Sequence, residues 1–146
     1  MKKMKYSDLY VEDDIQTGEH IFYIDRNKTV PFNGVIEDYN KGVLVWEFEV
    51  QDGFKTGIER AYYPTGELQE LNETDHNTTN GRAKEFYRNG QLKSYSIVIR
   101  NVQIISVIYD ETGDIVETWE IGEGDPSYSV VRDRIPEYRS RYKLEL

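Results

Sequence analysis

The densest group of ionisable side chains in this sequence is a run of carboxylates that surrounds one tryptophan, Trp119. Its members are Asp110, Glu111, Asp114, Glu117, Glu120, Glu123 and Asp125. Two carboxylates held about 5 to 10 Å apart can serve as the acid and the base of a glycoside hydrolase. Here the carboxylates are too numerous and too regular to single out two, and there is no cysteine nucleophile, no Ser-His-Asp order and no phosphate-binding glycine loop. We therefore expect no enzymatic activity and assign no catalytic residue.

The same side chains fit protein recognition better. Carboxylates around an exposed aromatic residue would suit occlusion of a basic, phosphate-binding cleft on a partner, with the tryptophan as a hot spot and the carboxylates setting the orientation. The alternative is a solvated acidic face with the tryptophans packed in the core. The predicted partner-binding residues are Trp46, Asp110, Glu111, Asp114, Glu117, Trp119 and Glu120. A smaller acidic group, Glu67, Glu70, Glu73 and Asp75, is interpreted as loop solvation.

Charge and composition limit the partners further. The formal net charge of −9 argues against nucleic acid and anionic membranes, which attract lysine and arginine, and favours a protein with a basic surface. With no cysteine and only His20 and His76, far apart in sequence, we expect no metal site and no cofactor. The amino terminus lacks the apolar stretch of a signal peptide, and no run approaches the roughly 20 apolar residues of a membrane span. The expected location is the cytoplasm.

The elements that must position these residues follow a repeat of about 24 residues, a period typical of stacked repeat architectures. The repeat is marked by almost evenly spaced glycines, and a second glycine series runs in step with the first. Two series locked to one period are unlikely by chance, so they predict one structural unit stacked several times. The first series is Gly42, Gly66, Gly90 and Gly113, and the second is Gly34, Gly57 and Gly81.

Each copy of the repeat predicts a β-hairpin. A tyrosine precedes the turn glycine by three residues (four in the last copy) and an aliphatic residue follows it by two, so both can lie on one face. Asn89-Gly90 predicts a type I′ turn, and the second glycine series is expected between hairpins. Neighbouring hairpins must pair to bury their apolar row, which predicts an all-β, elongated antiparallel meander. The tyrosines are Tyr39, Tyr63, Tyr87 and Tyr109, and the aliphatic residues are Leu44, Leu68, Leu92 and Ile115.

We expect one repeat domain over residues 1–146, with an N-terminal capping strand region at 1–29, repeats at 30–121 and a C-terminal extension at 122–146. Residues 97–108 are the most apolar stretch and predict a more buried part of the sheet, where Ile105 replaces the expected glycine. The tail alternates with period two, which predicts a strand, although a short helix pairing Tyr138 with Tyr142 competes. Either would cover an open sheet edge. Its alternating residues are Tyr138, Ser140, Tyr142, Leu144 and Leu146.

The pattern Tyr-x-x-Gly-x-Leu, joined to the next copy by a second glycine, is clearest in residues 57–68 and 81–93. It resembles the MORN-repeat variant and, more closely, the bacterial YwqK-type proteins. The resemblance covers about residues 30 to 121. It implies an antitoxin or immunity protein that binds and neutralises a secreted polymorphic toxin, often a nuclease or a deaminase. Other members of the wider MORN group act as scaffolds or membrane-associated modules, and no catalytic residue comes with the motif.

Overall fold

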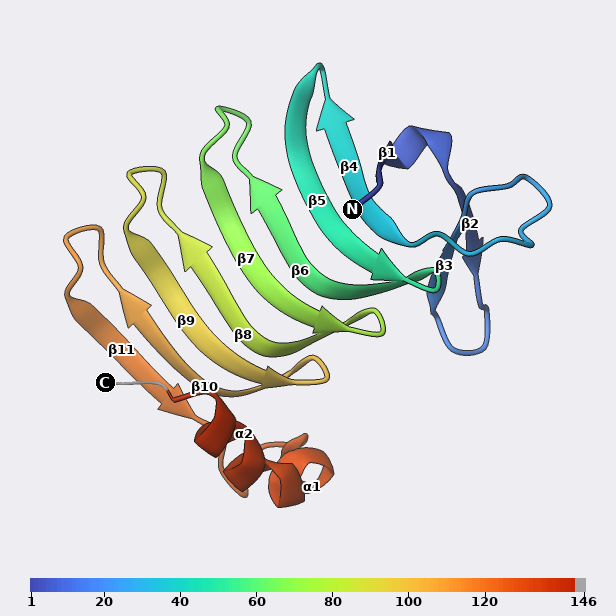
Figure 1. The fold of residues 1–146 in the computed structure, drawn as a ribbon. Helices are drawn as coiled ribbons and strands as arrows, with labels where there is room; N and C mark the ends of the chain where they lie inside the picture. The colour runs from blue at the N-terminus through green and yellow to red at the C-terminus, as the bar shows by residue number, and fades with distance from the viewer. Residues whose placement is uncertain (144–146) are drawn as a thin grey trace.

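The computed structural model describes residues 1–143 and consists of one curved nine-stranded sheet with a cap at each end (Figure 1). From β4 onward, strands that are neighbours in sequence are neighbours in the sheet, so the predicted all-β antiparallel meander is confirmed. The exception is β1, which pairs parallel to β4 at the sheet edge. The strands are β1 (Lys3–Lys5), β4 (Gly34–Asn40), β5 (Val43–Gln51), β6 (Phe54–Tyr62), β7 (Leu68–Asp75), β8 (Thr78–Phe86), β9 (Leu92–Ile99), β10 (Val102–Tyr109) and β11 (Ile115–Glu120).

The first glycine series lies in the hairpin turns, as predicted, but the predicted turn type at Asn89-Gly90 is wrong. Only Gly90 has a positive φ, of 87°, whereas a type I′ turn needs it at both central residues. This turn is closed instead by the Gly90 N–H, which donates to the Tyr87 carbonyl at 3.0 Å. The positive φ at both central residues that a type I′ turn needs occurs in the turns between hairpins, at Asp52–Gly53, His76–Asn77 and Arg100–Asn101. It also occurs in the hairpin turn of the first copy, at Lys41–Gly42.

The second glycine series was expected between hairpins, and this expectation is wrong. Gly57 and Gly81 lie inside β6 and β8, with φ of +118° and +120°. Each faces a glutamate of the preceding strand. Glu73 Oε2 accepts a hydrogen bond from the backbone N–H after Gly81 at 2.6 Å, and Glu49 does the same after Gly57. A Cβ on Gly81 would lie 2.6 Å from Glu73 Oε2, so the glycine makes room for the carboxylate.

The last copy replaces both members of this pair. Ile97 stands one repeat period after Glu73, and Ile105 stands one repeat period after Gly81. The two isoleucines are directly opposite each other on β9 and β10 and are 1% and 7% exposed. The glycine is therefore absent where the glutamate is absent, and the position joins an apolar core instead. This confirms that residues 97–108 form a more buried part of the sheet.

Two clusters of buried side chains close the ends of the sheet. The N-terminal cluster gathers around the small sheet of β2 (Tyr10–Asp13) and β3 (His20–Tyr23), and packs on β4 and β5. Its buried members are Leu9, Phe22, Phe32, Ile36, Phe48 and Val50. The C-terminal cluster joins β9 and β10 to the helical tail. Its buried members are Ile97, Ile99, Ile104, Ile105, Ile121, Val131 and Tyr138.

The tail is helical, so the predicted strand is wrong and the competing helix is confirmed. Its helices are α1 (Tyr128–Val131) and α2 (Ile135–Arg141), joined by a 3-10 turn. Pro136 in the first turn of α2 suits a helix start, and burial of Tyr138, which is 1% exposed, fixes one face of the helix. The Tyr138 and Tyr142 rings lie 5.9 Å apart. The other tail residues of the predicted strand, Leu144 and Leu146, lie outside the described residues.

Candidate functional site

The register of the strands assigns side chains to two faces of the sheet, because directly opposite residues share a face. We call one of them the groove face. The N-terminal cluster covers its first strands through Phe48, while the C-terminal cluster packs on the opposite face through Ile97 and Ile105. The groove face is therefore open from β6 to β11. One continuous row along it consists of Phe48, Glu59, Asn72, Ala83, Ser96, Ser106 and Trp119.

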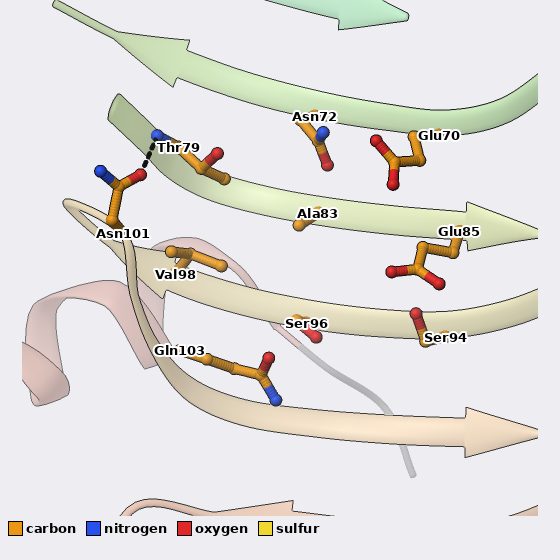
Figure 2. Close-up of a pocket in the computed structure, with 10 residues that line it drawn as sticks. All are labelled: Glu70, Asn72, Thr79, Ala83, Glu85, Ser94, Ser96, Val98, Asn101 and Gln103. Atoms are coloured by element: carbon orange, nitrogen blue, oxygen red, sulfur yellow. Dashed lines mark hydrogen bonds between the residues drawn. The ribbon is translucent and has the colours of Figure 1, made fainter. Parts of the chain in front are cut away.

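A groove of about 260 Å³ crosses β7 to β10 on this face (Figure 2). It forms because small side chains, Ala83, Ser94 and Ser96, occupy its centre while longer polar side chains surround them. Ser96 is only 8% exposed. Its hydroxyl lines the groove and has no hydrogen-bond partner within the described residues. The complete lining is Glu70, Asn72, Thr79, Ala83, Glu85, Ser94, Ser96, Val98, Asn101 and Gln103.

Two carboxylates of the groove lie directly opposite each other, Glu70 on β7 and Glu85 on β8. Burial raises the pKa of Glu70, and the charges of Glu85 and Glu59 raise it further. Like charges directly opposite destabilise a sheet. No lysine or arginine is among the lining residues, so the groove presents negative charge without a cation of its own.

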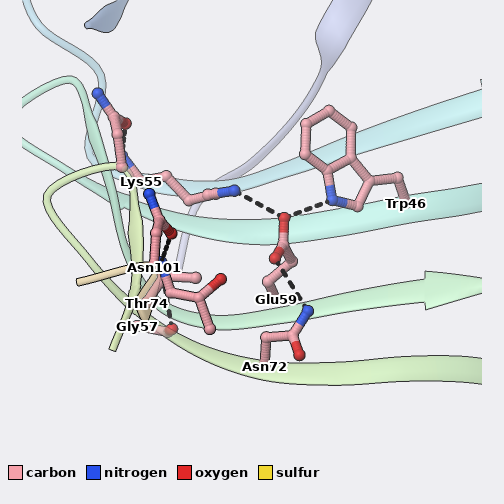
Figure 3. A network of polar contacts seen from close by, with 9 residues as sticks. Trp46, Lys55, Gly57, Glu59, Asn72, Thr74 and Asn101 are labelled. Carbon is pink, nitrogen blue, oxygen red and sulfur yellow. Dashed lines mark hydrogen bonds and ion pairs between the residues drawn. The ribbon is translucent and has the colours of Figure 1, made fainter. Parts of the chain in front are cut away.

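Glu59, beside the groove, has a different environment (Figure 3). Its carboxylate accepts hydrogen bonds from Trp46 Nε1 at 2.9 Å, from Lys55 Nζ at 2.8 Å and from Asn72 Nδ2 at 3.3 Å. The Trp46 ring also packs beside Phe48, with centroids 4.3 Å apart. Glu59 is thus fully partnered and ties the N-terminal cluster to the sheet. This placement agrees with the core-packing alternative for Trp46, whose role in partner binding stays a prediction.

Successive hairpins are joined by a repeated tyrosine contact. Tyr63 donates through its hydroxyl to the carbonyl of Phe86 at 2.6 Å, and Tyr87 donates in the same way to the carbonyl of Tyr109 at 2.8 Å. Residues 55–75 and 79–97 match the MORN repeat variant. The first match spans β6 and β7 almost entirely, and the second spans β8 and most of β9. A search of curated proteins and a search of solved structures found no match.

The MORN-variant hairpins carry most of the groove, whereas the predicted acidic residues follow them and are divided among three environments. Asp110 accepts hydrogen bonds from the Thr112 hydroxyl at 2.6 Å and from the Asp114 N–H at 3.0 Å. These bonds lower the pKa of Asp110 and hold the β10–β11 turn, in which the exposed Glu111 also lies. Glu120 pairs with Arg139 of α2.

Three residues of the predicted partner-binding set lie on the groove face, Trp46, Glu117 and Trp119, and of these Trp46 packs against the N-terminal cluster. Trp119, 38% exposed, lies opposite Ser106, and Glu117 lies opposite Ile108. Both stand on β11, one strand beyond the groove. The partner-binding roles of the whole predicted set stay predictions, and these two residues are the ones placed to act together with the groove.

The sequence pattern does not predict the groove, and the interpretation of Glu70 as part of a solvated loop is wrong. Glu70 and Glu73 instead lie in β7, where Glu70 points into the groove and Glu73 faces Gly81. A signal was present in the turn at His76–Asn77, since its position fixes which residues of β7 and β8 are opposite. Counting outward from that turn places Glu70 on the same face as Ala83 and Glu85, and a register shift between Asn72 and Thr74 then makes Glu85 its direct partner.

Two further findings concern other kinds of site. Among residues 1–143, no three side chains of His, Cys, Asp or Glu are grouped so that they could hold a metal ion. In the same described part of the chain, no helix has the length and apolar character needed to cross a membrane.

Proposed function

We propose that this protein is an immunity protein that binds and neutralises a toxin in the cytoplasm, without catalysing a reaction, by docking its groove face on a basic surface of that toxin. The observation that carries the proposal is the pair of opposed carboxylates, Glu70 and Glu85, in an open groove that holds no cation of its own. The net charge of −9 and the resemblance to immunity proteins support the same partner class.

The groove face offers the elements of a protein interface. Adjacent strands lie about 4.8 Å apart, so β7 and β11 are separated by about 19 Å, which suits the centre of an interface that buries about 800 Å² on each partner. Trp119 stands at one side of this area and the N-terminal cluster at the other. Tryptophan is typical of the centre of such an interface, and polar side chains like those of the groove are typical of its rim.

A toxin that acts on nucleic acid supplies a matching surface. Such enzymes bind phosphates with clustered lysine and arginine, and an acidic groove would compete for the same cluster. The proposed neutralisation is therefore steric and electrostatic occlusion of the toxin's substrate cleft. Complementary charge would also raise the association rate and make it dependent on salt.

Co-expression with the protein encoded beside its gene tests this function. We expect cells to grow when both proteins are present, to die with the neighbouring protein alone, and the two proteins to co-elute from a size-exclusion column. Equal death with and without this chain, together with no complex, would refute the proposal.

A repeat scaffold is the second candidate, and the outer edge of β11 favours it. Val116 is 61% exposed and Ile115 is 48% exposed, and no strand within residues 1–143 pairs with that edge. An open edge strand can accept an added strand. A Val116→Lys change that abolishes partner binding, while the Glu70→Gln and Glu85→Gln changes leave it intact, would favour this second function.

A further inference from the structure

We propose that the groove is a subsite for the guanidinium of one arginine side chain. The inference rests on the proposed function, because the arginine would belong to the bound toxin, and it specifies the chemistry of that same face. It is carried by the arrangement of Glu70, Glu85 and Ser96 around the small residues at the groove centre.

The groove needs a positive charge from outside. Glu59, the third carboxylate nearby, forms an ion pair with Lys55 at 2.8 Å, so Lys55 does not neutralise Glu70 or Glu85. Glu70 and Glu85 have no equivalent partner: no hydrogen bond or ion pair of either carboxylate occurs within residues 1–143. The one hydrogen bond that Figure 2 marks for a lining side chain is donated by the Thr79 N–H to Asn101 Oδ1, at 2.8 Å, and it involves neither glutamate.

The hydrogen-bond acceptors of the groove outnumber the three donors that a lysine ammonium group could offer them. The groove contains two carboxylates whose Cβ atoms are about 5 Å apart. The unpartnered hydroxyl of Ser96 is a further acceptor in the same groove. Asn72 adds its Oδ1, because its Nδ2 is used on Glu59. A lysine has three donors on a compact head, whereas a guanidinium has five in a planar fork that suits paired carboxylates. The set therefore favours arginine.

The size and the walls of the groove fit a single side chain. Its volume of about 260 Å³ is below the roughly 300–1,000 Å³ of a small-molecule pocket. Ala83 and Val98 give the lining an apolar part, against which the methylene stem of an arginine can pack. The groove opens on the face that carries Trp119, so an arginine projecting from a docked protein can enter it.

The test uses N-acetyl-arginine amide as the probe and the backbone amide NMR spectrum of the full chain as the readout. We expect saturable shifts centred on Ala83, Ser94 and Ser96, weaker binding of N-acetyl-lysine amide, and no binding of N-acetyl-citrulline amide, which has nearly the same shape without the charge. The double variant Glu70→Gln with Glu85→Gln should weaken binding by at least about tenfold, because charge-assisted hydrogen bonds are lost. The matched control is Glu123→Gln, the same change on an exposed segment outside the groove.

Three results would overturn the inference: no shift up to the solubility limit of the probe, equal binding of the arginine and citrulline probes, or equal binding of the arginine and lysine probes. Both glutamine changes are isosteric and remove a repulsion, and an unchanged amide spectrum outside the groove verifies folding. The outcomes separate the two proposals. Probe binding without growth rescue refutes the immunity function and keeps the arginine site, whereas rescue without probe binding refutes the arginine site alone.

Discussion

Replacing Gly81 by alanine is the sharpest test of how the repeat is constructed. Gly81 lies in β8 with φ of +120°, and the carboxylate of Glu73 occupies the space beside it. An alanine Cβ would be 2.6 Å from Glu73 Oε2 and 3.2 Å from Glu73 Cβ. The carboxylate would have to leave, and the Arg82 N–H, which donates to it at 2.6 Å, would lose its acceptor.

The expected loss of stability has two parts. Placing alanine at a positive φ costs about 1–2 kcal/mol, and leaving the Arg82 N–H without its carboxylate costs about 1–3 kcal/mol. Together they predict a loss of about 2–5 kcal/mol in the free energy of unfolding. Gly90→Ala is the matched control, because Gly90 also has a positive φ, of 87°, but an added Cβ would meet nothing within 4 Å. Only the first part applies to it.

Urea unfolding of both variants measures the difference. We expect Gly81→Ala to lose about 1–3 kcal/mol more than Gly90→Ala. A double-mutant cycle then isolates the carboxylate: Glu73→Ala should destabilise the natural protein and have little further effect in the Gly81→Ala background. Equal losses at the two glycines, or additive effects in the cycle, would refute the idea that this glycine exists to accommodate the glutamate.

Three further predictions concern the groove and the contacts between repeats. Glu85→Gln should stabilise the fold by about 0.2–1 kcal/mol at pH 7 and lower the pKa of Glu70, checked by carboxyl NMR titration. An unchanged pKa of Glu70 in the Glu85→Gln variant would contradict the predicted repulsion. Because the pKa of Glu70 is raised in the folded protein, this carboxyl group favours folding at low pH, and that contribution is lost as the pH rises through its pKa in the folded protein. Tyr87→Phe removes the hydroxyl bond to the carbonyl on β10 and should cost about 0.5–1.5 kcal/mol in urea unfolding. Tyr138→Phe removes the 2.7 Å bond to Asn80 and should lower stability by a similar amount with helical content retained; natural stability would show that this bond does not fasten the tail.

The spacing of residues was sufficient to predict the meander but not the conformation of its turns. Asn89-Gly90 carries the strongest local signal for a type I′ turn, yet the loop closes through the Gly90 N–H and the Tyr87 carbonyl. The same dipeptide serves both geometries, and the choice depends on how the flanking strands are paired. Conversely, Arg100 and Asn101 adopt a type I′ turn without a glycine, so the usual signal was missing there.

The helical tail shows a second limit of sequence patterns. Its apolar and charged residues alternate with period two, which predicts a strand. In the structure, Tyr138 is buried in the C-terminal cluster and its hydroxyl donates to Asn80, 58 positions earlier in the chain. Contacts so distant in sequence decide between strand and helix for a short segment, because local preference is weak.

The groove could not be predicted from composition, because it is a property of register and not of sequence density. The densest acidic segment, residues 110–125, is divided among a turn, an ion pair with Arg139 and the groove face. The functional candidates Glu70 and Glu85 are well separated in sequence and become neighbours only when β7 pairs with β8. Period alone gives the positions of the turns, and pairing then determines which charges meet.

The repeat itself indicates where specificity must lie. Tyr63 and Tyr87 join one hairpin to the next, and the turn glycines provide the positive φ of the hairpin turns, so these repeated positions carry little information about a partner. Equivalent positions on the groove face carry different residues in most copies. The position of Glu70 is occupied in the other copies by Trp46, Ser94 and Glu117, and that of Asn72 by Phe48, Ser96 and Trp119. One copy thus supports the N-terminal cluster, the next two form the groove and the last presents an exposed aromatic residue. A repeated scaffold with unequal side chains on one open face can bind one partner selectively, since each strand contributes a different contact at a fixed spacing of about 4.8 Å.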